Sequence, residues 1–153
     1  MKKFELTSEF VTFLGKKLFR IKALISFGNV EEGELGGYVE KEENLSNDGN
    51  AWVYGDARVY GDAMVSGDAM VSGNAWVYGD ADYATVQGFG SEYRTTTFFR
   101  TKAGDIGVRC GCFYGTLEEF RAKVKETHGE TKTAKEYLMV ADLMEFRFSK
   151  EEA

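Results

Sequence analysis

The stretch GDARVYGDAMVSGDAMVSGNAWVYGDA, residues 55–81, decides the fold, because it repeats every six residues. A valine leads each unit, and a glycine followed by aspartate or asparagine closes it; the valines are Val53, Val59, Val65, Val71 and Val77. A strand alternates its side chains with a period of two, so a strict period of six does not indicate a plain hairpin. The pattern predicts a solenoid of triangular coils, in which valine points inward, alanine fits the corner and glycine makes the turn.

Three such units make one coil of 18 residues. Residues 18 apart should therefore stack about 4.8 Å from one another, the spacing of neighbouring strands. We expect Val53 to lie beneath Val71, and Val59 beneath Val77. The corner aspartates are expected to hydrogen-bond the amides of their own turns. No bound metal is predicted, since a calcium ion requires a cage of six or more oxygens.

The repeat and the segment before it, RIKALISFGNVEEGELGGYVEKEENLSNDGNAWV at residues 20–53, together resemble a known family. Residues 18–86 are similar to hexapeptide-repeat proteins of bacteria and their phages. The resemblance implies a short left-handed parallel β-helix. It implies no established activity.

The two positions beside each valine should point away from the coil axis, and many of them carry large side chains. These are Trp52, Tyr54, Tyr60, Met64, Met70, Trp76 and Tyr78. A contiguous exposed surface of aromatic residues and methionine indicates an interface. We expect a homo-oligomer, with a trimer favoured as in many proteins of this architecture. The alternative is that flanking segments of the same chain cover this surface.

The flanks predict different structures on the two sides of the repeat. Residues 1–44 alternate with a period of two and predict a β-hairpin that caps the solenoid at 45–86. Residues 87–153 predict a ββαα module, with Thr116 and Glu119 forming a capping box for the first helix and Thr133 and Glu136 for the second. The fold class is therefore mainly β, with two C-terminal helices.

Three segments of the C-terminal module resemble a module attached to varied proteins in phages of Gram-positive bacteria. They are GSEYRTTTFFRTK at residues 90–102, CGCFYGTLEEF at 110–120 and KETHG at 125–129. This resemblance implies a viral origin and no assigned chemistry.

Composition excludes several classes of protein. The net charge is −6, and residues 45–86 carry one basic and six acidic side chains, which argues against duplex nucleic acid as a partner. Nothing approaches 18 unbroken apolar residues, so no membrane span is expected. The two cysteines are two residues apart and cannot easily bridge. These features favour the cytoplasm of a bacterial host.

The sequence offers two catalytic hypotheses: acyl transfer beside the coils, and catalysis by a cysteine–histidine pair. Many hexapeptide-repeat proteins transfer acyl groups and need a histidine base beside the coils, but His128 is the only histidine and follows the repeat by some forty residues. Cys110 and Cys112 with His128 could form a nucleophile–base pair or an incomplete zinc site. The alternative is that these cysteines are buried core residues. No cofactor is predicted.

A polar and basic group lies on or near the expected C-terminal hairpin. It consists of Ser91, Arg94, Thr97, Arg100, Lys102 and Arg109, with His128 nearby. Charge-assisted hydrogen bonds from such a group suit a phosphate or another small anion. The alternative is a solvated hairpin face.

The combined expectation is a non-catalytic, oligomeric, phage-type binding protein. It would counter a bacterial defence system by binding a nucleotide-like anion or a host protein. Two alternatives remain open at this point: an acyltransferase or Cys/His-dependent enzyme, and a structural protein that self-assembles end to end.

Overall fold

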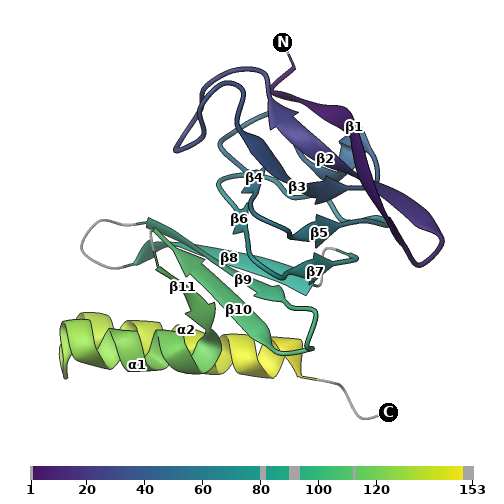
Figure 1. The fold of residues 1–153 in the computed structure, drawn as a ribbon. Coiled ribbons are helices and arrows are strands. Elements are labelled where there is room, and N and C mark those ends of the chain that lie inside the picture. Colours follow the sequence, from purple (N-terminus) through teal and green to yellow (C-terminus); the bar gives the residue numbers. More distant parts are fainter. Residues whose placement is uncertain (1, 80–81, 90–93, 112, 150–153) are drawn as a thin grey trace.

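A computed structural model describes residues 2–79, 82–89, 94–111 and 113–149. Figure 1 shows four parts one above another: an N-terminal hairpin, a stack of short coils, a four-stranded sheet and a pair of helices. The chain is mainly β with two C-terminal helices, as the sequence predicts.

The coils stack in parallel. Strands β3 (Leu35–Val39), β5 (Arg58–Val59) and β7 (Trp76–Val77) pair along one side, and β4 (Trp52–Val53) pairs with β6 (Met70–Val71) along another. A single parallel bridge from Leu45 to Val65 marks the third side. The predicted stacking of Val53 with Val71 and of Val59 with Val77 is confirmed.

The first coil is two residues longer than the second, because Val39 pairs with Val59 whereas Val59 pairs with Val77. The additional length forms a short 3₁₀ turn, Glu42–Asn44. Asn44 is fully buried, and its amide donates to the carbonyls of Gly61 and Ala63. Its side-chain oxygen accepts from the N–H groups of Glu40 and Lys41. The irregular coil is thus fixed by one side chain with all its hydrogen bonds made.

Small apolar side chains fill the solenoid interior. The five repeat valines are all fully buried, and the described corner alanines Ala57, Ala63, Ala69 and Ala75 are buried with them. Two glycines of β3, Gly36 and Gly37, allow this strand to lie close to the residues of the next coil. A Cβ on Gly37 would lie 2.5 Å from the Ala57 carbonyl oxygen and 2.7 Å from a Val53 methyl group. Only a residue without a side chain fits there.

The N-terminal hairpin extends one side of the solenoid into a five-stranded mixed sheet of order β1-β2-β3-β5-β7. Strands β1 (Phe4–Phe13) and β2 (Lys16–Ala23) are antiparallel, and β2 pairs with β3. The turn falls at Leu14–Gly15, both with positive φ. Two consecutive positive φ values suit a tight hairpin turn.

The C-terminal part contains four strands rather than the two expected. They are β8 (Tyr83–Phe89), β9 (Arg94–Arg100), β10 (Ile106–Cys110) and β11 (Phe113–Thr116), in the antiparallel order β11-β10-β9-β8. Strand β8 crosses the expected solenoid boundary at residue 86. The side chains of β8 alternate between the two faces of the sheet: Ala84 and Val86 face the helices, whereas Thr85 pairs with Thr97 on the other face. This alternation becomes clear only once β8 is paired with β9.

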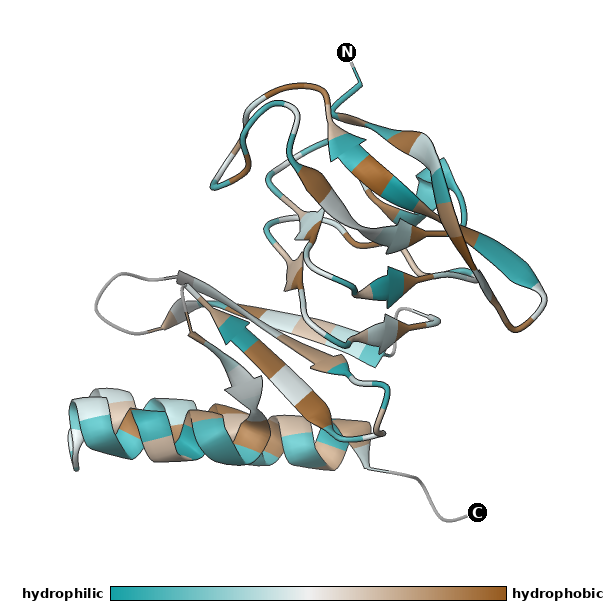
Figure 2. Ribbon diagram, viewed as in Figure 1, coloured by the Kyte–Doolittle hydropathy of each residue, from teal (hydrophilic) through white to brown (hydrophobic). Residues whose placement is uncertain are grey.

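Helices α1 (Leu117–His128) and α2 (Lys132–Phe148) cover one face of this sheet (Figure 1). The capping box of Thr116 and Glu119 is confirmed. The expected box of Thr133 and Glu136 is wrong, because Thr131 caps α2 and accepts from the Ala134 N–H. Starting at Lys132 gives the helix an N-cap hydroxyl and leaves Thr133 inside its first turn. Figure 2 shows hydrophobic and hydrophilic residues alternating along both helices.

The other face of the four-stranded sheet closes the end of the solenoid. The Met70 N–H donates to Thr97 Oγ1, and the Lys102 N–H donates to the Asn74 carbonyl. Ala75 and Thr101 form an antiparallel bridge. The last coil therefore does not present an open edge, which would otherwise invite pairing with another chain.

Lys3 closes the opposite end of the solenoid. Its side chain is almost fully buried, and Nζ donates to the carbonyls of Ala51 (2.8 Å) and Gly49 (3.4 Å). The ammonium group also lies 4.7 Å from the ring centroid of Phe27. Burial lowers the pKa of Lys3 to about 8.

The close approach at Gly37 can be tested by Gly37→Ala. The methyl group overlaps backbone on the next coil, so we expect the free energy of unfolding to fall by about 1–3 kcal/mol. Gly79→Ala is the matched control, because a Cβ there meets nothing within 4 Å. Urea unfolding followed by circular dichroism measures both. Equal stabilities of the two variants would contradict the packing described for the first coil.

The lowered pKa of Lys3 makes stability depend on pH. Between pH 8 and 10.5 the unfolded chain holds a proton on Lys3 that the native chain has lost, so this residue makes stability rise with pH, by up to about 3 kcal/mol. Urea unfolding at pH 7.5 and pH 10 should show this rise in the wild type and lose it in Lys3→Met. The exposed Lys22→Met should keep it. A rise of the same size in all three proteins would show that Lys3 ionises as in the unfolded chain.

Candidate functional site: an arginine beside two aromatic rings

The predicted anion-binding group is not brought together. In the antiparallel pair β9–β10, Ile106 lies opposite Arg100 and Thr97 lies opposite Arg109. Residues 97 and 100 of one strand face opposite sides, so the two arginines lie on opposite faces of the sheet. Ser91 and the Arg94 side chain lie outside the described residues.

Arg100 and Arg109 each have structural contacts of their own. Arg100 donates to Asp82 (2.8 Å) and lies over the ring of Phe148, on the helix side. Arg109 donates to Ser72 and to the Gly111 carbonyl, and lies over Tyr54 on the solenoid side. Thr97 is fully buried, whereas Lys102 is exposed in the β9–β10 turn.

The candidate catalytic pair is placed in the helix layer. Cys110 packs partly buried against the core under the helices, and the Thr96 hydroxyl donates to its sulfur (3.2 Å). His128 ends α1 and stacks on the ring of Tyr137, with the four-stranded sheet between it and the coils. Cys112 lies outside the described residues. Among the residues described, no three His, Cys, Asp or Glu side chains gather as a metal site would need.

Two of the large side chains on the outside of the coils are covered by the chain itself. Trp52 is fully buried under Phe4 and Phe27, and Tyr60 is buried under Phe13. The expectation that these two are available to another copy is therefore wrong. The N-terminal hairpin and the loop after it supply the covering rings, a tertiary arrangement that local periodicity does not reveal.

The remaining expected interface residues are partly or wholly accessible. Tyr54, Met70 and Trp76 are half-buried, whereas Met64 and Tyr78 are exposed. Within the described residues, the N–H of the Trp52 indole is a buried donor without an acceptor.

Cationic and aromatic side chains alternate along the outer face of the mixed sheet. The register places Arg20 beside Tyr38, Tyr38 beside Arg58 and Arg58 beside Trp76, on four adjacent strands. The Arg20 guanidinium lies 4.5 Å from the Tyr38 ring centroid. The Arg58 guanidinium lies 5.8 Å from Trp76 and 4.9 Å from Phe13 of β1. We call this row the arginine–aromatic ladder.

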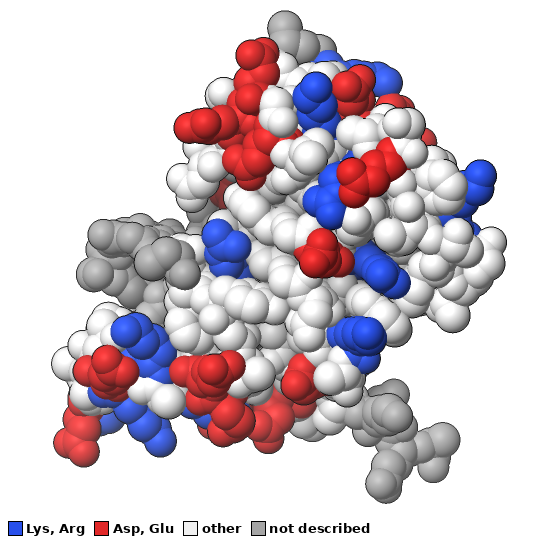
Figure 3. Space-filling view, in the orientation of Figure 1, with Lys and Arg blue, Asp and Glu red and all other residues white. Residues whose placement is uncertain are grey.

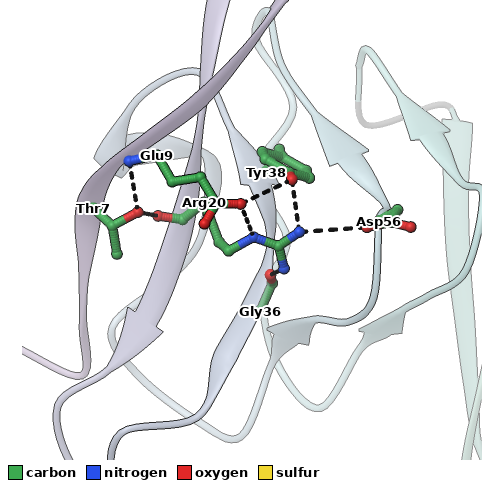
Figure 4. A network of polar contacts seen from close by, with 6 residues as sticks. All are labelled: Thr7, Glu9, Arg20, Gly36, Tyr38 and Asp56. Carbon is green, nitrogen blue, oxygen red and sulfur yellow. Dashed lines mark hydrogen bonds and ion pairs between the residues drawn. The ribbon is translucent and has the colours of Figure 1, made fainter.

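The Arg20 guanidinium makes four hydrogen bonds (Figure 4). Its guanidinium donates to Glu9 (2.8 Å), to the Gly36 carbonyl (2.8 Å) and to the Tyr38 hydroxyl (2.6 Å). Asp56 approaches at 3.4 Å and completes a planar, charge-assisted arrangement. Arg20 is therefore a structural clamp that joins the hairpin to the first corner of the repeat.

Arg58 has no such acceptor. It is half-buried, and no described carboxylate, carbonyl or hydroxyl accepts a hydrogen bond from its guanidinium. The other arginines whose side chains are described and half-buried all have acceptors; they are Arg20, Arg100, Arg109 and Arg121. Among the described residues, nothing therefore accepts from the five guanidinium donors of Arg58, which lie beside two aromatic rings.

The acidic groups near Arg58 are already engaged. Glu40 accepts from the Gly61 N–H and from Lys16, and the Gly61 hydrogen bond is the main reason why the pKa of Glu40 is lowered. Asp82 binds Arg100 and two backbone N–H groups of the last turn. Burial raises the pKa of Tyr60, and the charge of Asp82 adds to this rise. The Tyr60 phenol therefore stays neutral beside the guanidinium.

This arrangement can hold an anionic group. A guanidinium that packs on one side against two aromatic rings keeps N–H groups for two parallel hydrogen bonds to a carboxylate or a phosphate. One signal in the sequence points to it: Arg58 is the single basic residue within the acidic segment 45–86, at a position where other units carry Met or Trp.

Comparisons with known proteins concern the repeat. A family model described as the YdcK beta solenoid repeat matches residues 51–67, 57–72 and 63–79. The chain is thus similar to beta-solenoid repeat proteins across the coils that carry Arg58. The comparison with curated proteins gave no match. No helix among the described residues is both long and apolar enough to span a membrane.

Two equivalent positions of the ladder should respond differently to the same change. Arg20→Gln leaves carboxylates and a carbonyl without their donor, and we expect a loss of about 2 kcal/mol in the free energy of unfolding. Arg58→Gln removes ring contacts alone, and we expect a loss below about 1 kcal/mol. Thermal and urea unfolding of both variants measure the difference. A larger loss for Arg58→Gln would mean that this arginine is a structural clamp as well.

Proposed function

We propose that the protein is a non-catalytic binding protein, in which a left-handed hexapeptide-repeat coil serves as a rigid frame. One observation carries this proposal: the half-buried Arg58 guanidinium, fixed by Phe13 and Trp76, has no acceptor among the described residues. Arg58 and both rings lie on strands of the five-stranded sheet. The orientation of the guanidinium is therefore set before any ligand binds. Preorganisation of this kind lowers the entropic cost of binding.

The ligand should carry a carboxylate or phosphate group. Tyr78 is exposed, and its ring lies 5.4 Å from that of Tyr60, on the same side of the sheet as the ladder. An exposed ring close to a guanidinium suits a ligand that combines a flat aromatic group with a negative charge. A nucleotide-like anion has this chemistry, and so does an acidic segment of a host protein with an aromatic residue.

The resemblance of residues 18–86 and of the C-terminal module to phage proteins supports the proposal that this binding takes place in the cytoplasm of an infected bacterium. There, capture of a nucleotide signal or of a host protein would counter a defence system. Self-association belongs to the same proposal, but Trp52 and Tyr60 do not provide its surface, since the hairpin covers them. Acyl transfer is not favoured, because His128 does not lie on the coils.

The Arg58 site predicts a selective loss of binding. In ¹⁵N-resolved spectra, ADP and inorganic pyrophosphate should shift the Arg58 Nε–H resonance, and Arg58→Gln should weaken their binding at least tenfold. Lys102→Gln is the matched control, because Lys102 is exposed and belongs to the group first predicted from the sequence. Calorimetric titration gives the affinities.

A host-protein ligand is tested by the same pair of variants. Capture from host lysate should then depend on Arg58 and not on Lys102. Binding that survives Arg58→Gln, or that is lost in Lys102→Gln, would contradict the Arg58 site. The absence of any Arg58-dependent ligand in both assays would contradict the proposed function.

A further inference from the structure

The turn of the N-terminal hairpin holds a leucine in a conformation that leucine rarely adopts. Phe13 pairs with Lys16, so the loop consists of two residues, Leu14 and Gly15, with φ values of 52° and 76°. Turns of this kind favour asparagine before glycine, because both residues need a positive φ. Leu14 is the one residue other than glycine with a positive φ in the described part of the chain. Its backbone strain therefore opposes folding.

Contacts within the chain do not offset this strain. Leu14 is 74% exposed, so its side chain buries little apolar surface in the fold. A single exposed leucine needs no explanation by itself. A leucine that is both exposed and strained does, because asparagine at the same position would give a more stable and more polar turn. The conformation therefore indicates a contact with another molecule.

The tip of the hairpin lies beside the Arg58 site. Leu14 directly follows Phe13, whose ring centroid lies 4.6 Å from that of Trp76 and 4.9 Å from the Arg58 guanidinium. Figure 1 shows the tip reaching the level of β5 and β7. Figure 3 shows mostly uncharged surface there, at the right of the view. An exposed leucine and a guanidinium without an acceptor thus border the same surface.

The charges of this surface suit one carboxylate better than a chain of phosphates. Arg20 already binds Glu9, and Lys16 binds Glu40. Among the described residues of the ladder and its border, Arg58 is thus the cation that has no carboxylate. A nucleotide diphosphate brings several negative charges close to these carboxylates, whereas a single carboxylate matches a single guanidinium.

We infer that the hairpin tip extends the Arg58 site into a docking surface for an acidic segment of another protein. The segment places a carboxylate on Arg58 and an aliphatic side chain against Leu14. This inference rests on the proposed anion binding at Arg58, and it selects a protein over a nucleotide as the ligand. Leu14 favours that choice, because an aliphatic side chain neither hydrogen-bonds the edge of a base nor stacks on it as an aromatic ring does.

A double-mutant cycle between protein and peptide tests the contact with Leu14. The probes are acetylated peptides with one leucine and one aspartate separated by one to four glycines, which an extended chain spans in about 7–17 Å. Replacing the peptide leucine by alanine should weaken binding of the best probe to the wild type at least fivefold in calorimetric titration. In Leu14→Asn this replacement should have no effect, whereas replacing the peptide aspartate by asparagine should still weaken binding. Additive effects of the two leucine changes would overturn the contact.

Thermal unfolding tests the strain. Leu14→Asn should raise the midpoint by about 2–4 °C, because asparagine tolerates a positive φ. Met139→Asn is the matched control, since Met139 is 71% exposed but lies on α2. It should neither gain stability nor change peptide binding. A Leu14→Asn protein less stable than the wild type would contradict the strain on which the inference depends.

Pyrophosphate and ADP separate this inference from the proposed function. If the wild type binds either of them through Arg58 but binds no peptide of the set, or binds ADP more tightly than any peptide, the docking surface is wrong and the anion site stands. If neither these anions nor any peptide binds in a way that Arg58→Gln weakens, both proposals fail. Peptide binding that needs both Arg58 and Leu14 supports the docking surface.

Discussion

The parallel stacking of successive coils is the constraint on which the rest of the structure depends. Each short strand has two residues, so no coil is stable alone, and stability comes from burying valine and alanine against the coil above and below. Such a stack has two open ends with unpaired backbone groups. The chain provides both closures: Lys3, Phe4 and the hairpin at one end, and the Thr97 face of the four-stranded sheet at the other.

The hairpin that closes one end of the solenoid also determines which side chains on the outside of the coils stay exposed. The hairpin that extends the ladder of strands also folds Phe13 over Tyr60 and Trp76, and thereby removes much of their aromatic surface from solvent. What remains is a row of alternating arginines and rings. Arg20 is used to hold the hairpin, whereas Arg58, two strands further along, is held by the hairpin and bonded to no described acceptor. The same row thus contains a clamp and the arginine that we propose as the binding group.

The C-terminal sheet separates two environments in a similar way. Its solenoid face carries Thr97, Phe99 and Arg109, and its helix face carries Phe98, Arg100 and Cys110. Residues that are close in sequence are therefore assigned to different layers. This separation explains why a dense run of basic and hydroxyl residues forms no common site.

The sequence by itself determined the coil, because a period of six with valine and glycine at fixed places is a local property that any stacked arrangement must satisfy. It also determined the first helix, through the Thr116 and Glu119 box and the Gly129 stop. Tertiary structure decided which outer side chains stay exposed, since Phe13 and Phe4 reach Tyr60 and Trp52 across some fifty residues of chain. It also decided which arginine lacks an acceptor, because strand register and the faces of a sheet are set by long-range pairing that no short window of sequence contains.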